Sequence, residues 1–374
     1  MKVVYITDQV YLHGGAERVL SNKVNYLTAL YDVKVYIITS EQNEQKPCYP
    51  IHPEVIFNDL NINYEREKSY FSLLNLIRLP KHYLRLHSIL NKIKPDIIVT
   101  LSSQFDYYFL PYIKKGIPKI KEFHSSRHYY EEKRNHSSFF KSIIYRLNDF
   151  TEKKYTYIAI LTNDEKKYFY SNNTVVIPNA LTEFPKKTSH LKNKKIISAG
   201  RIAPVKGFEN LILAWEIVVK KKNNWILEIY GNGEKSYIDK LNKMVNDASL
   251  ENTIFFRDAT NDIESKMAEA SLYVMTSKTE CFPMVLLEAM SVGLPVISFD
   301  CPNGPKNIIT NNHDGLLVPN KDIKLLASAM LLLMIEEPLR QKFSQNAKIK
   351  VKNYDKQIIM KKWLNLFNYK TRNE

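Results

Sequence analysis

Two glutamates, Glu280 and Glu288, stand on either side of the apolar segment "CFPMVLL", and their carboxylates could take part in chemistry. Most glycoside hydrolases use such a carboxylate pair, one group acting as acid and the other as base or nucleophile. Pro283 has a fixed φ angle and no N–H, so it suits the first turn of a helix. We therefore expect Glu280 in a loop and Glu288 on the following helix, which Gly293 ends.

The helix after Pro283 is apolar on every side, which predicts that it is buried. A carboxylate there needs hydrogen-bonding partners, so Glu288 must meet polar groups. One interpretation is an internal arginine or a neighbouring backbone. The other is a ligand, because the N–H groups near Met284 and Val285 would attract an anion such as a nucleotide diphosphate. The ribose hydroxyls of that nucleotide would then donate to Glu288.

Cationic groups for a diphosphate occur in "SAGRIAPVKGFENLI", where a predicted strand ends at Gly200 and Arg201 and Lys206 follow in a loop. Arginine binds phosphate oxygens through two N–H groups, and lysine adds a compact charge. An isolated pair of this kind is commonly a solvated basic loop. Its position at the carboxyl end of a strand, where open α/β sheets bind ligands, favours a binding role.

Two glycine turns also follow predicted strands. "YGNGE" places Gly231 and Gly233 in a partial dinucleotide fingerprint, because Ser236 occupies the third glycine position. "HGGAER" places Gly14 and Gly15 where a ligand could approach the backbone closely, although the motif is not a Walker loop. Neither turn identifies a ligand by itself.

His124 ends a predicted strand in "EFHSSRHYY" and lies four residues before His128, the spacing of helical metal pairs. The sequence offers no evident third ligand, and a strand end does not give helical geometry. We therefore favour a polar contact of His124 with a substrate over a structural histidine or a metal ligand. No D-x-D motif occurs, so we expect no metal.

The elements that must position these residues alternate between strands and helices. Predicted strands cover residues 2–7, 32–39, 95–101 and 118–124, and then 194–200, 225–231, 252–258, 270–276 and 294–299. This alternation predicts an α/β fold of two similar halves, each with a parallel, doubly wound sheet. The polar, lysine-rich segment 182–195 is predicted as the linker, and residues 357–369 as a closing amphipathic helix.

Composition limits the classes of protein. The 374 residues favour about two domains, and 44% hydrophobic content excludes general disorder. The longest apolar run, 329–335, is too short for a membrane span, and three cysteines without a CxxC pair indicate free thiols, so we expect a cytoplasmic protein. The net charge of +15 implies an anionic partner: nucleic acid, an anionic membrane surface or a phosphorylated substrate.

Taken together, the motifs resemble those of the GT-B fold retaining glycosyltransferases of family 4. The resemblance rests on "GGAER", the "GR…KG" pair, "YGNGE", the E-x7-E spacing of Glu280 and Glu288, and "NHDGLLVPN" at 312–320, in the family's order. It implies two Rossmann-like domains that face a central cleft. Residues 1–182 would form the acceptor-binding domain, joined by a returning helix at 357–374, and residues 183–356 would bind the nucleotide sugar.

The resemblance also implies roles for residues of this sequence. Arg201 and Lys206 would bind the diphosphate and stabilise its charge as it leaves. Glu288 would accept hydrogen bonds from the ribose, and Glu280 would contact the donor sugar. The remaining contacts would come from the backbone at Phe282, Pro283, Met284 and Val285, from the glycines Gly14, Gly15, Gly200, Gly231 and Gly233, and from His124 near the sugar and the acceptor.

The family's mechanism is a front-face displacement with retention of the anomeric configuration, in which the donor phosphate helps to take the acceptor proton. It requires no hydrolase-like base, no metal and no cofactor. Two residues depart from the pattern: Cys281 stands where glycine is commoner, and Asp258 stands where a glycine often lies near the base. Because of Cys281 the identity of the donor sugar stays open, and because of Asp258 the identity of its base stays open. From the family we expect a UDP-linked hexose.

The basic charge bears on the acceptor. Residues 78–94 contain five Lys or Arg and no acid, with Leu79, Tyr83, Leu86, Leu90 and Ile93 on one stripe. We expect this stripe to pack on the sheet, with cations free to face an anionic membrane. Residues 127–146 mix aromatic and cationic side chains, which would suit a lipid-diphosphate-linked saccharide and peripheral attachment to the inner membrane face.

Three other functions remain open for the chain. They are a nucleotide-sugar epimerase, a non-catalytic scaffold that keeps the donor site, and, with no supporting motif, a nucleic-acid-binding protein.

Overall fold

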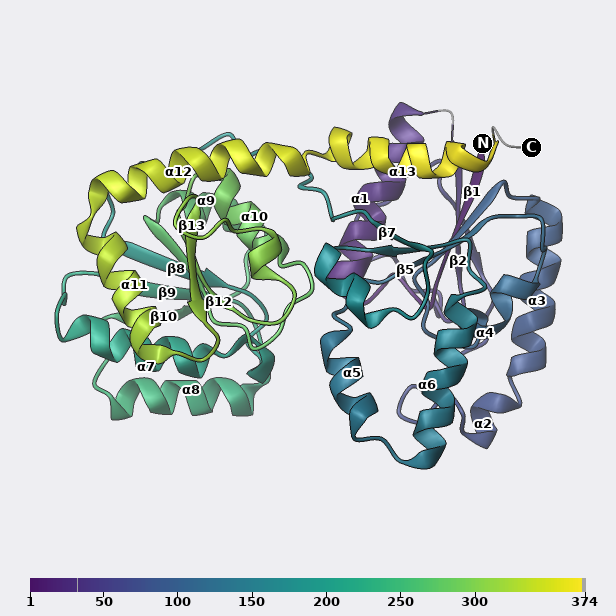
Figure 1. Cartoon of the computed structure of the whole chain (residues 1–374), viewed down its shortest axis with the longest axis horizontal. Coiled ribbons are helices and arrows are strands. Elements are labelled where there is room, and N and C mark those ends of the chain that lie inside the picture. Colours follow the sequence, from purple (N-terminus) through teal and green to yellow (C-terminus); the bar gives the residue numbers. More distant parts are fainter. Residues whose placement is uncertain (32, 372–374) are drawn as a thin grey trace. The chain divides into compact units, whose positions relative to one another are not determined.

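The computed structural model describes residues 1–31 and 33–371, which form two compact units. The first unit contains Met1–Pro178 and the end of the chain from Ile359, and the second contains Asn179–Ile358. The sequence placed these divisions at 182/183 and 356/357. Each unit is α/β, with one parallel sheet and helices around it (Figure 1).

The first unit has a seven-stranded sheet in the order β3-β2-β1-β4-β5-β6-β7. Its strands are β1 Lys2–Thr7, β2 Lys34–Thr39, β3 Ile56–Asp59, β4 Ile97–Thr100, β5 Lys119–Glu122, β6 Tyr157–Ile160 and β7 Thr174–Val176. All neighbouring strands run parallel. The central strands β1 and β4 are almost wholly buried runs of β-branched and aromatic residues, the pattern of a sheet covered on both faces.

Helices of the first unit connect these strands. They are α1 Gly15–Leu30, α2 Leu73–Leu76, α3 Leu79–Ile93, α4 Asp106–Phe109, α5 His128–Asn135, α6 Phe139–Glu152 and the returning α13 Lys356–Thr371. In α3 the residues Leu86, Leu90 and Ile93 are buried as predicted, but Tyr83 is exposed and His82 takes the buried position instead. His82 is accommodated because its Nδ1 lies 2.9 Å from the hydroxyl of Tyr64.

The second unit has a six-stranded sheet in the order β10-β9-β8-β11-β12-β13. Its strands are β8 Lys195–Ala199, β9 Ile226–Tyr230, β10 Ile254–Arg257, β11 Leu272–Met275, β12 Val296–Asp300 and β13 Gly315–Pro319. Its helices are α7 Phe208–Val219, α8 Lys235–Asp247, α9 Ile263–Ala268, α10 Met284–Ser291, α11 Ile323–Ile335 and α12 Glu337–Val351. The predicted strands of both halves are confirmed, apart from Asp32, which lies outside the described residues.

The segment predicted as a linker, 182–195, packs on the second unit. The Ser189 N–H donates to the carbonyl of Val292 at 2.8 Å, and the Asn193 side chain donates to the carbonyl of Glu269 at 2.7 Å. Leu191 is buried with 5% of its surface exposed. The segment therefore forms part of the second unit's packing, which polar composition alone does not reveal.

Helix α13 returns to the first unit, as the sequence predicted, although residues 372–374 of the predicted span lie outside the described residues. Trp363 and Phe367 on this helix are buried, and their rings contact each other at 5.8 Å. The chain end therefore contributes to the core of the first unit. Among the described helices, none combines the length and the apolar character that crossing a membrane requires.

Candidate active site

The predicted site residues of the second unit gather at the carboxyl ends of two neighbouring strands, β8 and β11. The chain leaves β8 toward β9 on one side of the sheet and leaves β11 toward β12 on the other. Open α/β sheets bind ligands at such a reversal of strand order. Gly200, Arg201 and Lys206 follow β8, and Glu280 follows β11. The topology therefore brings these residues, which are far apart in the sequence, to one edge.

Lys206 and Glu280 form an ion pair at this edge. The Lys206 Nζ lies 2.7 Å from Oε1 of Glu280, and the Ser277 hydroxyl donates to the same oxygen at 2.7 Å. The Lys206 side chain is 26% exposed and that of Glu280 is 13% exposed, so both groups remain reachable from solvent. The sequence indicated both residues but not their contact, and Ser277 was missed.

A turn after β12 supports the position of Glu280. A Cβ atom added to Gly304 would lie 2.5 Å from the Cβ of Glu280 and 3.0 Å from the Cδ of Pro283. Only glycine fits there, because real Cβ atoms do not approach each other so closely. Gly304 was not among the predicted residues, although the Pro/Gly-rich stretch "CPNGP" marks a turn.

Gly231 and Gly233 serve the packing of two loops. A side chain at Gly231 would collide with the carbonyl of Gly200, and one at Gly233 would collide with the carbonyl of Ile202. The N–H of Ile202 donates to the carbonyl of Asn232 at 2.8 Å, which joins the loops after β8 and β9. These glycines allow the loop carrying Arg201, which is exposed, to lie close to its neighbour.

Helix α10 begins at Met284, with Pro283 at the N-cap position, and no side chain caps it. The N–H groups of Met284 and Val285 therefore face the loop of Glu280 and Phe282 without a capping side chain, which makes them suitable donors to an anion. Glu288, which follows Glu280 by eight residues, lies on α10 and is 4% exposed. The structure confirms the prediction that Glu280 lies in a loop and Glu288 on the following helix.

Tyr273 on β11 connects the surroundings of the two glutamates. Its ring is fully buried, and its hydroxyl donates to the carbonyl of Ala199 at 3.1 Å. Burial raises the pKa of Tyr273, and the negative charges of Glu280 and Glu288 raise it further.

Cys301 is a buried thiol beside the ion pair. Burial raises its pKa to about 12, and the charge of Glu280 contributes in the same direction. Cys281, the residue that departs from the family pattern, is also buried. Since a thiol must be deprotonated to react, Cys301 is not suited to nucleophilic chemistry.

In the first unit, His124 follows β5 and is held by a buried carboxylate that the sequence analysis did not identify. Its Nε2 lies 3.0 Å from Oε2 of Glu122, and both carboxylate oxygens of Glu122 accept from the Lys23 Nζ, at 2.6 and 2.7 Å. Burial alone would raise the pKa of Glu122, but the Lys23 charge and the His124 hydrogen bond outweigh it and lower the pKa to about 2. Glu122 is thus an ionised acceptor, so Nε2 of His124 donates the hydrogen bond between them.

The other ring nitrogen of His124, Nδ1, is inaccessible to solvent and has no hydrogen-bond partner among the described residues. His128 begins α5, and its ring meets that of Tyr168 edge-on at 6.1 Å. Within residues 1–31 and 33–371, no group of three His, Cys, Asp or Glu side chains could hold a metal ion.

Gly14 and Gly15 begin α1 and differ in their surroundings. A side chain at Gly14 would collide with the carboxylate of Glu17, whereas nothing lies within 4 Å of a Cβ added at Gly15. The backbone at Gly15 is therefore open to a ligand. Gly14, Gly15 and His124 belong to the first unit and the other predicted residues to the second, so the structure describes two separate groups.

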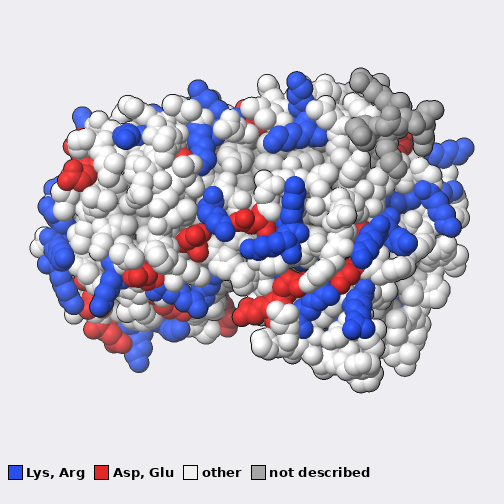
Figure 2. All heavy atoms as spheres, viewed as in Figure 1, with Lys and Arg blue, Asp and Glu red and all other residues white. Residues whose placement is uncertain are grey.

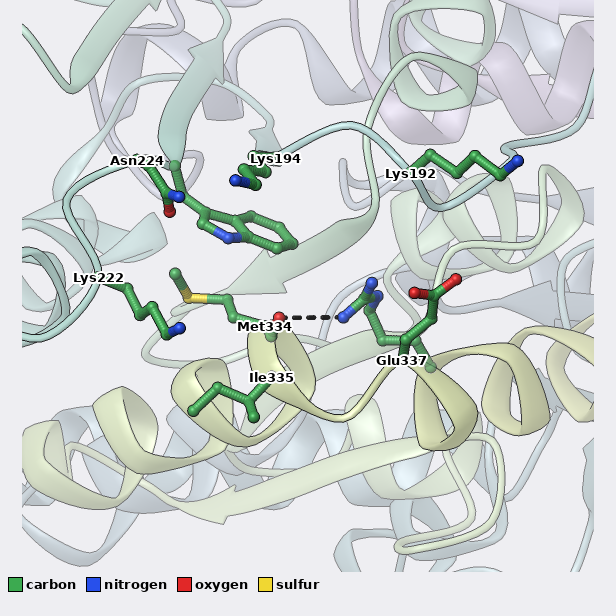
Figure 3. A pocket seen from close by; sticks show the side chains of 9 residues that line it. Lys192, Lys194, Lys222, Asn224, Met334, Ile335 and Glu337 are labelled. Carbon is green, nitrogen blue, oxygen red and sulfur yellow. Dashed lines mark hydrogen bonds between the residues drawn. The ribbon is translucent and has the colours of Figure 1, made fainter.

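A hollow of about 390 Å³ lies at the opposite, amino-terminal edge of the second sheet (Figure 3). It is lined by Lys192, Lys194, Lys222, Asn224, Trp225, Met334, Ile335, Glu337 and Arg340. The Arg340 guanidinium donates to the carbonyls of Leu333 and Met334, at 2.7 and 3.1 Å, where α11 ends. Arg340 thereby satisfies the end of a helix, and the hollow contains no predicted site residue.

Comparison with solved structures bears on the fold. HepE of Anabaena in complex with UDP superimposes with a TM-score of 0.78 at 17% identity, over 99% of this chain and 100% of that chain. The fold is GT-B. Residues 180–350, within the second unit, match the model of the family described as glycosyl transferases group 1.

Two relatives are similar to this chain in sequence. An uncharacterized glycosyltransferase of Haemophilus influenzae is 27% identical over 94% of this chain and 95% of its own length. The poly(ribitol-phosphate) alpha-N-acetylglucosaminyltransferase of Staphylococcus aureus is 35% identical over 55% of this chain and 40% of its own length. In its second unit, this GT-B chain is therefore related to group 1 glycosyltransferases.

Proposed function

We propose that the chain is a retaining glycosyltransferase of family 4, which moves a hexose from a UDP-sugar to a saccharide acceptor in the synthesis of a surface polysaccharide or glycan. The observation that carries the proposal is the Lys206–Glu280 pair at the strand reversal of the second sheet, inside the segment that matches group 1 glycosyltransferases. The UDP complex of HepE, which has the same fold, supports UDP as the nucleotide.

The donor is assigned to the second unit. Its diphosphate receives the charges of Arg201 and Lys206 and the N–H groups at the start of α10, while Glu288 accepts from the ribose hydroxyls. When the diphosphate attracts Lys206, Glu280 exchanges its contact with Lys206 for hydroxyls of the donor sugar. The Ser277 hydrogen bond keeps Glu280 in place during this exchange.

The reaction then requires no protein base. The bond between the anomeric carbon and the diphosphate oxygen breaks, the acceptor oxygen forms its bond on the same face, and the acceptor proton passes to the leaving phosphate. Arg201 and Lys206 stabilise the negative charge that develops on the diphosphate. A preformed Lys206–Glu280 pair suits this role, because its charges are positioned before the donor arrives.

His124 contributes from the first unit. Glu122 holds the imidazole through Nε2, and 14% of the His124 side chain is exposed, so the exposed edge of the ring can contact a hydroxyl of the sugar or the acceptor. We assign His124 to positioning that hydroxyl. No step of the proposed reaction uses a metal or a cofactor.

The acceptor is assigned as a lipid-diphosphate-linked saccharide, met at the inner face of the cytoplasmic membrane. Cations lie over aromatic rings at α5: Arg127, just before α5, lies over the ring of Tyr130 at 4.6 Å, and Arg134 on α5 lies over the ring of Tyr170 at 4.6 Å. The Staphylococcus aureus relative is named for an anionic polymer acceptor, which is consistent with the net charge of +15 here.

The test is an incubation with a panel of UDP-, GDP- and dTDP-hexoses, with and without EDTA, and with membrane lipid extracts or short saccharides as acceptors. We expect UDP release that depends on acceptor and is insensitive to EDTA, and product NMR showing the anomeric configuration of the donor. An inverted product would contradict retention. Conversion of the sugar without acceptor would identify an epimerase instead.

A further inference from the structure

Two helices of the first unit turn large apolar side chains to solvent. We call them the α2–α6 surface, which consists of Leu73, Leu74, Leu76 and Ile77 at α2 and Phe139, Phe140, Ile143, Leu147 and Phe150 on α6. Phe139 and Phe140 are 76% and 78% exposed, and Leu73 and Ile77 are 73% and 67% exposed. Soluble proteins rarely expose so many large apolar groups together unless they bind something.

The two parts of this surface belong to one end of the first unit. Phe71, just before α2, packs edge-on against Tyr108 at 5.8 Å, and the Tyr108 hydroxyl donates to the Asn148 side chain of α6 at 2.8 Å. Figure 1 shows α2 and α6 at the same end of this unit, and the corresponding region is largely white in Figure 2, with both basic and acidic side chains beside it.

Helix α6 has the reverse of the usual orientation for a surface helix. Phe140, Ile143, Leu147 and Phe150 recur at intervals of three and four residues, so they form one stripe, and this stripe faces solvent. Polar residues hold the helix to the unit instead: Arg134 pairs with Asp149, and Arg127 pairs with the buried Glu152. An amphipathic helix anchored by its polar side presents its apolar side to a partner.

Charge decides between the partners that an apolar surface could bind. Lys141, Arg146, Lys153 and Lys154 are exposed along α6 and at its end, while Asp149 and Glu152, the two acids of α6, are both paired with arginines. A second copy of the chain would bring the same cations against each other. An anionic lipid surface satisfies both the cations and the apolar stripe.

We propose that the α2–α6 surface docks on an anionic lipid bilayer, with its apolar side chains in the boundary between headgroups and acyl chains. The inference rests on the proposed function, since it defines the surface by which the first unit reaches a lipid-linked acceptor. The apolar stripe of α3 is mostly buried against its own unit, as the sequence predicted, so we assign the apolar lipid contact to α6 rather than to α3.

The first experiment is flotation of the full chain with vesicles of phosphatidylcholine containing 30% phosphatidylglycerol, at low and high salt. The test variant is Phe139→Ser/Phe140→Ser, and the matched control is Leu325→Ser/Ile349→Ser, which changes apolar side chains that are also exposed, on the second unit. We expect the test variant to lose binding about tenfold or more, because two phenyl groups no longer leave water, and the control to bind like the wild type. Equal binding by both variants would overturn the proposal.

The second experiment separates insertion from simple charge attraction. Phe140→Trp adds an exposed tryptophan to a chain whose three native tryptophans, Trp215, Trp225 and Trp363, are at most 5% exposed. Vesicles with brominated acyl chains should quench the emission of the new tryptophan and shift it to shorter wavelengths. Binding without quenching would show that α6 does not enter the bilayer.

Two further readouts keep the outcomes distinct. If analytical ultracentrifugation showed a wild-type dimer that Phe139→Ser/Phe140→Ser dissociates, a second copy would cover this surface and the lipid proposal would fail. Binding of UDP in the absence of lipid, measured by calorimetry, reports on the donor site alone. A variant that loses vesicle binding but still binds UDP therefore has a defect in the docking surface alone. A wild-type chain that does not bind UDP would contradict the proposed function instead.

Discussion

Lys23 and Glu122, 99 residues apart in the sequence, form an ion pair inside the first unit, with the Lys23 Nζ 2.6 and 2.7 Å from the two carboxylate oxygens. The same Nζ lies 3.8 Å from the centre of the Trp363 ring, and Glu122 also accepts from His124. A candidate substrate contact is therefore fixed by a buried charge pair, which in turn is covered by the last helix of the chain.

Replacement of Lys23 should make the fold sensitive to mild acid. The folded-state pKa of Glu122 is about 2, below its unfolded value, so the ionised carboxylate stabilises the fold above about pH 4 and this stability is lost as the pH falls toward 2. Lys23→Met leaves Glu122 buried without its ammonium, so its pKa rises and the acid transition moves to higher pH. We also expect a loss of about 3 kcal/mol at pH 7.

Thermal unfolding between pH 7 and pH 3 measures this effect. Lys34→Met is the matched control, because Lys34 lies at the exposed start of β2. An unchanged acid profile in Lys23→Met would show that the pair does not hold the charge of Glu122.

Replacement of Glu122 by glutamine should change the histidine tautomer. A carboxylate can only accept from His124, whereas an amide can also donate to it, so Glu122→Gln no longer requires the proton on Nε2. We expect the ¹⁵N shifts of His124 to show a protonated Nε2 in the wild type and a mixture in Glu122→Gln. Turnover should fall about tenfold with a smaller change in KM for the donor. Identical ¹⁵N shifts in the two proteins would rule out this positioning role.

Lys206 and Glu280 should depend on each other in both stability and activity. Each single alanine variant should lower kcat/KM about 10²-fold or more, since it removes a charge from the developing diphosphate or a contact from the sugar. Because both side chains are partly exposed, their coupling in unfolding free energy should be only about 0.5–1 kcal/mol. Full activity of either variant would contradict the site.

The control for this double-mutant cycle is the surface pair Lys220–Glu216. The two side chains are 71% and 37% exposed, and the Lys220 Nζ lies 2.8 Å from Oε1 of Glu216. The pair therefore has a similar distance between its charges but lies outside the candidate site. Alanine at these positions should give a coupling of about 0.3–0.5 kcal/mol and unchanged transfer.

Gly304→Ala should impair transfer without unfolding the chain. The added methyl group would lie 2.5 Å from the Cβ of Glu280, so the loop carrying Glu280 must move. Small displacements of reacting groups are costly, and we expect kcat/KM to fall about 10- to 100-fold. Gly116→Ala, where nothing lies within 4 Å of the new atom, should behave like the wild type. Crystallography or NMR of Gly304→Ala would show whether Glu280 has shifted.

Most of the fold followed from local patterns, and the exceptions have physical causes. Buried β-branched runs identified the central strands, but β3 lies at a sheet edge with an exposed start, and its sequence "IFND" has no continuous apolar run. In α3, helical spacing alone could not distinguish Tyr83 from its neighbour His82, because the Tyr64 hydroxyl that satisfies the histidine lies in a different segment.

The positions of the candidate site residues followed from the sequence where they depend on neighbours along the chain. Pro283 precedes the first residue of α10, so Glu280 lies in the loop and Glu288 on the helix, and this is a local effect that the sequence displays. The Lys23–Glu122 pair is different, because a lysine in an amphipathic helix ordinarily lies at the surface. Only the packing of α1 against β5 and α13 reveals that Lys23 is 5% exposed.

The return of α13 also has a consequence for the synthesis of the chain. The second unit is continuous from Asn179 to Ile358, whereas the first unit needs residues from both ends of the chain. Trp363, which covers Lys23, follows the whole second unit in the chain, so it is translated only after that unit. The charge pair that holds His124 can therefore be enclosed only after the second unit has been synthesised, which makes completion of the first unit a late step.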